Sequence, residues 1–259
     1  MIAETRNRDL LERLLRNDEV WGGYALGDLQ EPHFSRTKWH LCELVDSWAL
    51  VMSYAFGESL TLMTFGEGQL LAEILRDLNL SGRCDLHVHR DHLDFVRPLF
   101  DGDWKAFLRL GLDRADFRPA EGPFDLEVRT LRNDDAPAAL ELYRHYPQNF
   151  FAPERIEEGQ YVGGWRAERM VAVAGTHVVS PSFRVAAVGD IVVDPSCRGE
   201  GIGAALTSLL CRRLFETVDL IVLNVAEDNT AARRCYEKLR FARAVAHFEG
   251  FSMRRAGVT

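Results

Sequence analysis

Apolar and polar positions along the second half of the chain alternate between the spacing of a strand and that of a helix. An apolar strand with Val188 and Ile191 to Val193 runs into a turn with three glycines, and a helix with apolar residues from Ile202 to Leu214 follows. Asp219 to Val225 is a second buried strand, and the polar run at Asn229 begins another helix. This half therefore has the patterning of an α/β fold.

The first half repeats this order of elements. The sequence predicts an initial helix at Arg8 to Leu15, and the pattern leaves Trp21 to Phe34 unassigned. Strands, a Gly66-Glu67-Gly68 turn and further elements then follow in the same order as later in the chain. Gly66-Glu67-Gly68 parallels Gly199-Glu200-Gly201. Two copies of one fold are therefore predicted. The predicted elements of the first copy are strands at 39–45, 48–54 and 60–65, a helix through Leu70 to Leu78, a strand at 85–89, a helix at 91–100 and a strand at 105–110.

A linker separates the two copies. Arg118 to Phe124 contains two prolines and a glycine between apolar segments. We therefore expect an N-terminal domain at 1–118, a linker at 119–124 and a second domain at 125–259. The first copy has no arginine before its glycines, carries Phe95 opposite Tyr236, and has Pro98 near the end of its last helix. The second copy is thus predicted to be the active one, and the first to shape the substrate site or the interface between domains.

Composition narrows the class of protein further. The chain has 259 residues, a formal charge of −8 and five scattered cysteines without metal spacing, which fits a reducing cytoplasm. Its negative charge argues against a nucleic-acid partner and favours a cationic or neutral amine. No apolar run reaches the length of a membrane span, and Met1 to Val20 is too charged for a signal peptide. We expect a cytoplasmic protein without a membrane partner, whose exposed sheet edges would allow a homodimer.

The glycine turn has the chemistry of a phosphate cradle. The first amides of a helix have no partner inside it, the helix dipole is positive at that end, and glycines let the backbone approach a pyrophosphate. The spacing of Gly199, Gly201 and Gly203 does not fit the dinucleotide fingerprint G-x-G-x-x-G, and the run G-K-[ST] of a nucleotide P-loop is absent from the sequence. A phosphate-bearing cofactor of another kind is therefore expected.

Two motifs carry a resemblance to a known family. The pattern R-x-x-G-x-G at Arg198, Gly201 and Gly203 follows V-x-P and resembles the acetyl-CoA loop of the GNAT superfamily of N-acetyltransferases. The run N-x-x-A-x-x-x-Y-E-K-L-R-F, from Asn229, resembles the second segment of that superfamily that contacts coenzyme A, with Arg240 in place of the usual glycine. The resemblance covers Asp125 to about Arg255. It implies a mixed, mostly antiparallel sheet flanked by helices, with a second, degenerate GNAT-like domain at the N-terminus.

The resemblance also implies roles for particular residues. Tyr236 is expected to be the general acid, because a phenol with a pKa near 10 can protonate a leaving thiolate whose pKa is near 8.5. Asp190 would orient the amine or accept its proton through water, and Glu127 and His177 are more distant candidates. The residues expected to bind acetyl-CoA are Ile191, Val192, Val193, Arg198, Gly199, Glu200, Gly201, Ile202, Gly203, Ala204, Asn224, Asn229, Ala232, Arg233 and Tyr236.

Each polar candidate also has a purely structural interpretation. Tyr236 could pack on the sheet, Asn229 could cap its helix, Asn224 could be a satisfied amide at a strand end, and Asp190 an exposed carboxylate. The aromatic loop His145 to Tyr161, with Tyr146, Phe150 and Phe151, and the loop Ser180 to Arg184 are expected to form the acceptor pocket.

The function that the resemblance implies is transfer of an acetyl group from acetyl-CoA to a primary amine of a small molecule, amino acid or peptide, by direct attack in a ternary complex. A non-catalytic module that binds or senses acyl-CoA needs the same loop and stays as the alternative. His87-Val88-His89, near His92, resembles the H-x-H metal ligands of amidohydrolases, but the eight-stranded barrel and the downstream ligands of that class are missing. We therefore expect no metal, and solvated histidines at the end of a strand.

Overall fold

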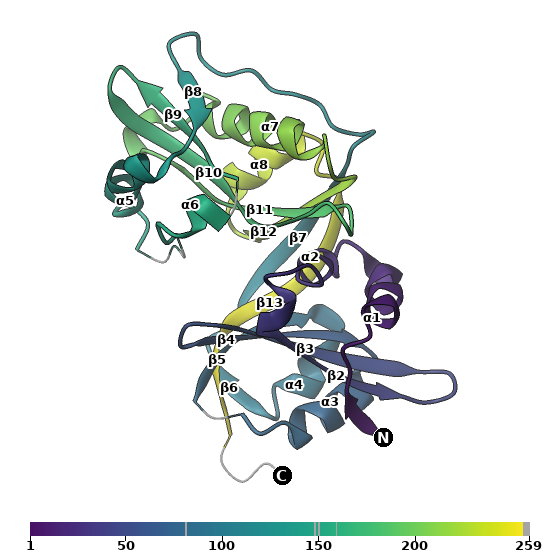
Figure 1. Ribbon diagram of the computed structural model, residues 1–259. Coiled ribbons are helices and arrows are strands. Elements are labelled where there is room, and N and C mark those ends of the chain that lie inside the picture. Colours follow the sequence, from purple (N-terminus) through teal and green to yellow (C-terminus); the bar gives the residue numbers. More distant parts are fainter. Residues whose placement is uncertain (81, 148, 150, 159, 256–259) are drawn as a thin grey trace. The chain divides into compact units, whose positions relative to one another are not determined.

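The computed structural model describes residues 1–80, 82–147, 149, 151–158 and 160–255, and the chain forms two compact units (Figure 1). Unit 1 contains Met1–Arg109 and the chain from Val245 onward, and unit 2 contains Leu110–Ala244.

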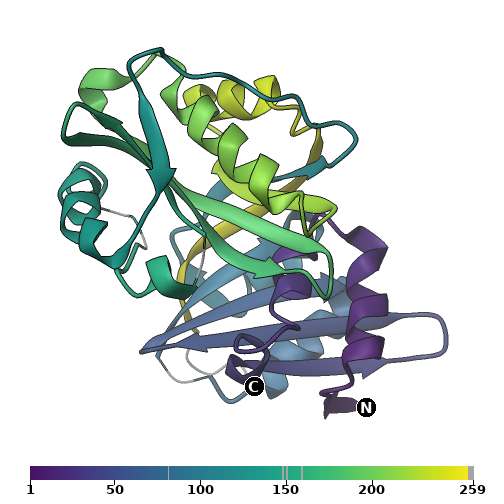
Figure 2. The same ribbon diagram turned by 45° about the horizontal axis from the view of Figure 1, so that its top comes forward.

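Unit 1 is a sheet with helices on both faces. Its strand order is β1-β2-β3-β4-β5-β13, and β6 pairs with β13. Leu71 and Leu75 of α3 share a core with Val51 and Leu62 of the sheet. Trp21 packs on Phe65. Figures 1 and 2 show α1 and α2 on the face opposite α3 and α4. The strands are β1 (Ile2–Glu4), β2 (Thr37–Glu43), β3 (Trp48–Phe56), β4 (Ser59–Gly66), β5 (Arg83–His89), β6 (Phe100–Gly102) and β13 (Arg243–Arg254). The helices are α1 (Arg8–Leu15), α2 (Gly23–Gly27), α3 (Gly68–Asp77) and α4 (Leu93–Val96).

Unit 2 has the same layered plan, with strand order β7-β12-β11-β10-β9-β8. Its strands are β7 (Lys105–Asp113, in unit 2 from Leu110), β8 (Glu127–Thr130), β9 (Val162–Arg166), β10 (Arg169–Ser180), β11 (Val185–Val193) and β12 (Leu220–Ala226). Its helices are α5 (Ala136–Tyr143), α6 (Arg155–Glu158), α7 (Ile202–Leu214) and α8 (Thr230–Lys238). Figures 1 and 2 show α7 and α8 on one face and α5 and α6 on the other. Short 3-10 helices occur at Arg16–Asp18, Phe34–Arg36, Arg90–His92, Asn133–Asp135 and Pro195–Cys197.

Both units contain one parallel strand pair in an otherwise antiparallel arrangement. Among the pairs with a described register, β4 pairs with β5 and β11 with β12 in parallel, each over three residue pairs, and the others are antiparallel. In each unit the first strand of the parallel pair leads through a G-E-G turn into a helix, α3 or α7, and then into the second strand. The predicted fold, a mixed and mostly antiparallel sheet present in two copies, is confirmed.

The last strand of the chain is in unit 1. Residues His247 to Met253 of β13 pair with His89 to Arg83 of β5. The expected second domain, 125–259, therefore covers a different set of residues from unit 2. Sequence patterning could not reveal this, because a strand pattern records alternation along the strand and not the strand beside it. The domain boundaries themselves stay a prediction, since compact units and repeated copies are different divisions of a chain.

The helix expected at 91–100 is wrong in its length. A 3-10 turn occupies Arg90–His92, α4 covers only Leu93–Val96, and Phe100 begins β6. Pro98 explains the early end, because proline has no amide hydrogen and disfavours helical geometry in the residue before it. The unassigned segment 21–34 contains α2 and a cis peptide bond between Glu31 and Pro32.

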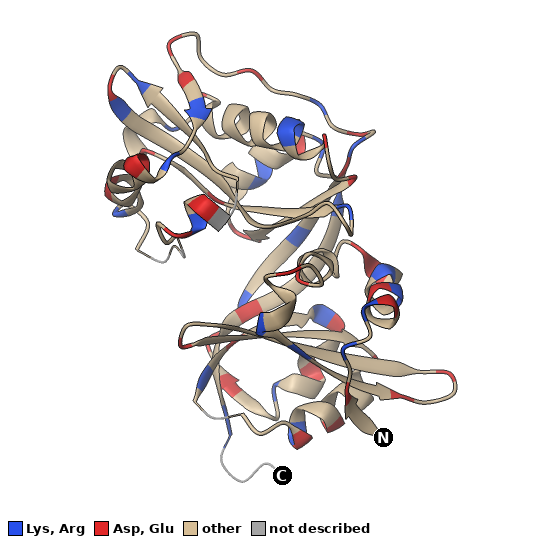
Figure 3. Ribbon diagram, viewed as in Figure 1, with Lys and Arg blue, Asp and Glu red and all other residues tan. Residues whose placement is uncertain are grey.

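Charged residues of both signs are interspersed over the two units (Figure 3). Among the described residues, no helix is both long and apolar enough to cross a membrane.

Candidate functional site

The start of α7 is an uncapped helix N-terminus. Gly199 and Gly201 have φ values of 84° and 83°, the left-handed region that favours glycine. Gly201 is the N-cap and makes no side-chain cap bond among the described residues, so the first amides of α7 face outward from the loop. A Cβ at either glycine would meet nothing within 4 Å. The loop thus offers amide donors and open space to an anion.

Two side chains of the loop, Arg198 and Glu200, make contacts with other elements. Glu200 makes a salt bridge with Arg166 of β9, whose Nε lies 3.0 Å from Asp125. The hydrogen bond from Arg166 holds the pKa of Glu200 below its usual value. Arg198 donates to the hydroxyl of Tyr146 at 2.9 Å. Glu200 is one of the residues expected to bind acetyl-CoA, and its carboxylate is paired with Arg166. Its contact with the cofactor stays a prediction.

A bulge interrupts β11 just before the loop. Val173 pairs with Val192, and Gly175 pairs with Gly189, so β11 has one more residue than β10 in this interval. Asp190 lies in the bulge with φ 52°, which is uncommon for a residue with a side chain. Its carboxylate accepts a 2.6 Å hydrogen bond from Tyr161, and its carbonyl accepts a 2.5 Å bond from Tyr143. Two buried tyrosines therefore hold Asp190, the residue expected to orient the amine or to accept its proton through water.

The bulge lies where β11 and β12 separate. Their described register ends at the pair Ala187 and Val222, although β11 continues to Val193. Ile191, Val192 and Val193 thus lie beyond the last described pair of β11 with β12. Their binding of the pantetheine arm stays a prediction. The carbonyl of Val193 already accepts a hydrogen bond from Tyr146.

The helix α8 begins beside the end of β12. Asn229 caps it by accepting from the amide of Ala232 at 3.1 Å, which is the structural role considered for this residue, and Arg233 donates to the carbonyl of Glu227 at 3.0 Å. Tyr236 is buried, and its ring lies 5.8 Å from that of Phe241. Asn224 is half-buried on β12 and has interactions of its own.

Arg240, which replaces the glycine usual in the family, has φ 72°. It follows the last turn of α8, where the amide of Phe241 bonds to the carbonyl of Tyr236 at 3.1 Å. The end of α8 therefore has the same hydrogen bond as a helix capped by glycine, although Arg240 must adopt the left-handed backbone conformation that favours glycine.

Aromatic residues gather on the other side of β11. Tyr143 stacks on Phe151 with ring centroids 4.5 Å apart, and Phe151 meets Tyr161 edge-on at 5.8 Å. Burial is the main cause that raises the pKa of both Tyr143 and Tyr161. His177 contacts Arg155 at 3.2 Å and lies over Gly189, whereas Glu127 is exposed on β8. Phe150 lies outside the described residues.

Tyr143 is a site residue that sequence reasoning missed. It ends α5, and its contact with Asp190 joins residues far apart in the chain. Tyr143 lies on the side of α5 that faces the sheet, in the same core as Ala139 and Leu142. This position was the one available signal for Tyr143, and it indicates core packing as readily as a functional site.

The corresponding turn in unit 1 is filled by its own side chains. Both carboxylate oxygens of Glu67 accept from the first turn of α3, from Gln69 at 2.9 Å and Leu70 at 3.0 Å. The ring of Phe95 lies 2.4 Å from where a Cβ of Gly68 would stand. Trp21 donates to the carbonyl of Thr64 at 2.8 Å, where β4 and β5 separate. These contacts occupy the positions that are open in unit 2.

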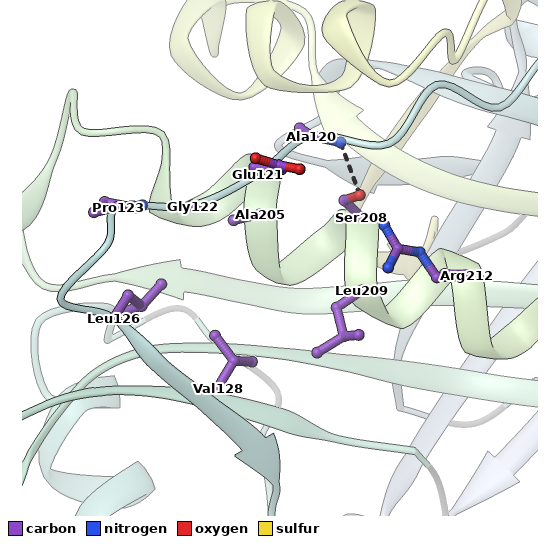
Figure 4. Close-up of a pocket in the computed structure, with 10 residues that line it drawn as sticks. All are labelled: Ala120, Glu121, Gly122, Pro123, Leu126, Val128, Ala205, Ser208, Leu209 and Arg212. Atoms are coloured by element: carbon purple, nitrogen blue, oxygen red, sulfur yellow. Dashed lines mark hydrogen bonds between the residues drawn. The ribbon is translucent and has the colours of Figure 1, made fainter.

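A hollow of about 240 Å³ lies elsewhere, between the linker and α7 (Figure 4). Ala120 donates to the hydroxyl of Ser208 at 2.9 Å and holds the linker along the helix. None of the candidate residues of the loop or of α8 lines it, so it is a separate feature. Its lining residues are Ala120, Glu121, Gly122, Pro123, Leu126, Val128, Ala205, Ser208, Leu209 and Arg212.

Comparison with known proteins agrees with this geometry. Residues 125–241 match the model of the acetyltransferase (GNAT) family. No curated protein matches the sequence. Similar solved structures include a Drosophila protein (TM-score 0.73, 12% identity, covering 97% of this chain and 98% of the other). A GCN5-related N-acetyltransferase from Kribbella flavida is also similar, with a TM-score of 0.60 and 15% identity, covering 92% of this chain and 95% of the other. A third similar structure is a tandem GNAT protein from the clavulanic acid biosynthesis pathway, with a TM-score of 0.57 and 13% identity, covering 98% of each chain.

Residues 125–241 thus match the GNAT acetyltransferase family. Over its whole length the chain has the fold of tandem GNAT structures, with a GNAT-like N-terminal half.

Proposed function

We propose that this protein transfers the acetyl group of acetyl-CoA to a primary amine of a small molecule, amino acid or peptide. The observation that supports this most is the uncapped start of α7 at Gly199 and Gly201, next to the edge of β11 that leaves β12. Amide donors for a pyrophosphate and a strand edge for an extended arm thus occur together. Acetyl-CoA is the co-substrate, and the protein works in the cytoplasm.

The proposed binding roles divide between two segments. Main-chain groups of Ile191 to Val193 hold the pantetheine arm, and an amide near Val193 donates to the thioester oxygen as negative charge develops there. The loop and the start of α7 bind the pyrophosphate, with Arg198 nearby. Side chains of α8 and β12 line the other wall. The loop residues are Gly199, Glu200, Gly201, Ile202, Gly203 and Ala204, and those of the other wall are Asn224, Asn229, Ala232, Arg233 and Tyr236.

The proposed chemistry needs two proton transfers. The amine nitrogen attacks the thioester carbon, its proton leaves toward Asp190 directly or through water, and the carbon–sulfur bond breaks. Tyr236 gives its proton to the departing thiolate, which is close enough to a phenol in pKa for this transfer to be efficient. The hydrogen bond from Tyr161 keeps the Asp190 carboxylate in one orientation.

Two measurements test the proposal. Calorimetry with acetyl-CoA should give one binding site per chain, because Glu67 and Phe95 fill the equivalent turn in unit 1. A thiol-release assay over amines, amino acids and peptide N-termini should then give turnover with at least one class. Binding without turnover on the whole panel would favour an acyl-CoA-binding or sensing module, and absence of binding at millimolar concentration would contradict both functions.

A further inference from the structure

Four of the eight histidines of the chain gather on one face of unit 1. On the paired strands β5 and β13, His87 stands opposite Glu249 and His89 opposite His247. His92 lies next to His89, with ring centroids 5.3 Å apart, and Trp21 lies 5.6 Å from His89 and 5.2 Å from His247. The expectation of solvated histidines at this strand end is wrong, since the side chains of His87 and His89 are 15% and 22% exposed and His92 is 5% exposed. His247 is fully buried beside them.

Three of these side chains converge on one point. One donor atom from each of His87, His247 and Glu249 lies within 4.8 Å of the other two. The Glu249 Oε1 atom is 2.8 Å from His247 Nε2 and 3.3 Å from His87 Nδ1. Donor atoms about 2.1 Å from a common ion stand roughly 3 to 4 Å apart, so small side-chain rotations suffice to bring all three onto one ion.

The hydrogen bonds of His87 leave a lone pair facing a carboxylate. His87 Nε2 lies 3.1 Å from the carboxylate of Asp85, which fixes the hydrogen on that nitrogen. His87 Nδ1 then faces Glu249 Oε1 without a hydrogen-bond partner among the described residues. Two electron-pair donors at this distance need a cation between them, and that cation is either a proton on His87 or a metal ion.

We propose that His87, His247 and Glu249 form a binding site for a divalent transition-metal ion of the zinc type. Two imidazole nitrogens and one carboxylate oxygen are a ligand set that zinc adopts, with a fourth position left for water. Asp85 orients His87 as an outer-shell carboxylate. The ion ties β13 to β5 and so fastens the C-terminal strand within unit 1.

Arg109 is the opposing charge near the site, because it interacts electrostatically with Glu249 and with both histidines. Its repulsion of a dication weakens the affinity expected of the site.

The sequence signal was incomplete. His87 and His89 point to one side of β5, but the third and fourth candidates, His247 and Glu249, come from a strand more than 150 residues later, which only the register reveals. His89 is excluded as a ligand through Nδ1, since that atom accepts from the amide of Asp91 at 3.2 Å. His92 is likewise engaged with Thr64 and Gly66.

The test is titration of the full chain, freed of metal by a chelator, with Zn²⁺ and Co²⁺. One equivalent of Zn²⁺ should bind, the melting temperature should rise, and Co²⁺ should give a visible absorption band of a nitrogen- and oxygen-ligated ion. His247→Gln and Glu249→Gln should each weaken Zn²⁺ binding at least tenfold, and Asp85→Asn by a smaller factor. The control is His40→Gln on β2 of the same unit, which should bind as the parent protein does.

Two results would overturn the proposal. One is a wild-type protein that takes up less than one equivalent of Zn²⁺ at 100 µM, which would mean that a proton on His87 is the cation of this cluster. The other is uptake that His40→Gln weakens as much as His247→Gln does. If a ligand variant fails to fold, the wild-type titration and the Co²⁺ spectrum still decide the question. Neither measurement depends on acetyl transfer, so the proposed function is tested separately.

Discussion

Tyr236 is the residue whose two interpretations differ most in their consequences. It is buried beside Phe241, so removal of its hydroxyl leaves the packing of the ring unchanged. Tyr236→Phe should lower kcat by 10²-fold to 10⁴-fold, the range of a lost general acid, with little change in the Kd of acetyl-CoA. Phe95→Tyr, at the equivalent position of unit 1, is a matched control that should leave kcat unchanged. Unaltered turnover in Tyr236→Phe would leave only a packing role.

Asp28 is a carboxyl group whose ionisation opposes folding. Burial raises its pKa to about 7, although the charge of Arg109 acts in the other direction. From about pH 4 to pH 7 the unfolded chain ionises at Asp28 while the folded chain keeps the proton. The wild type should therefore lose stability relative to Asp28→Asn by about 1.4 kcal/mol per pH unit over this interval.

Chemical denaturation of both proteins at pH 4.5, 6 and 7.5 measures this difference. The Nδ1 atom of His33 lies 4.0 Å from the carboxylate of Asp28, so the comparison is repeated in a His33→Gln background to remove this neighbouring ionisable group. Parallel pH curves for wild type and Asp28→Asn would contradict the raised pKa.

At the scale of elements, the turn before α7 depends on backbone conformation. Gly201→Ala meets no neighbouring atom, so its cost of about 1–2 kcal/mol comes from the left-handed φ alone. Because the same residue positions the first amides of α7, acetyl-CoA affinity should also fall about tenfold or more. Gly57→Ala is the control, since Gly57 has φ 58° and an equally open surrounding in a hairpin of unit 1. Calorimetry should separate the two variants, and equal affinity would count against the loop as the phosphate site.

How much the sequence predicted differs between kinds of element. Strands β2 to β5, β7, β11 and β12, the helices α3 and α7 and the glycine turns were predicted because their signals are local: alternation, helical spacing and glycines. Strands β1, β6, β9, β10 and β13 were not predicted. Asp190 and Tyr236 were named from motifs, but the bulge at Asp190 and the tyrosines that hold it depend on the register of β10 and β11. Register arises from contacts between distant segments, and a single sequence does not record them.

At the scale of the whole molecule, the division of the chain into units is discontinuous. A chain that stops after Ala244 loses the strand residues that pair with β5, and Ser252 and His247 of that strand are fully buried. This truncation should destabilise unit 1 and leave the contacts within unit 2 intact, since those residues end at Ala244. Limited proteolysis should then cut unit 1 rapidly and spare a fragment of about residues 110–244. A unit 1 as resistant as in the full chain would show that β13 is dispensable there.

The pairing of β5 with β13 also has a consequence for protein synthesis. Domains usually fold as they leave the ribosome, with the N-terminal one first. Here one edge of β5 is exposed until β13 has been translated, because this partner strand follows unit 2 in the sequence. Unit 1 should therefore reach its native state after unit 2, although it is made first, and the open edge of β5 is the segment that a nascent-chain chaperone would have to shield in the meantime.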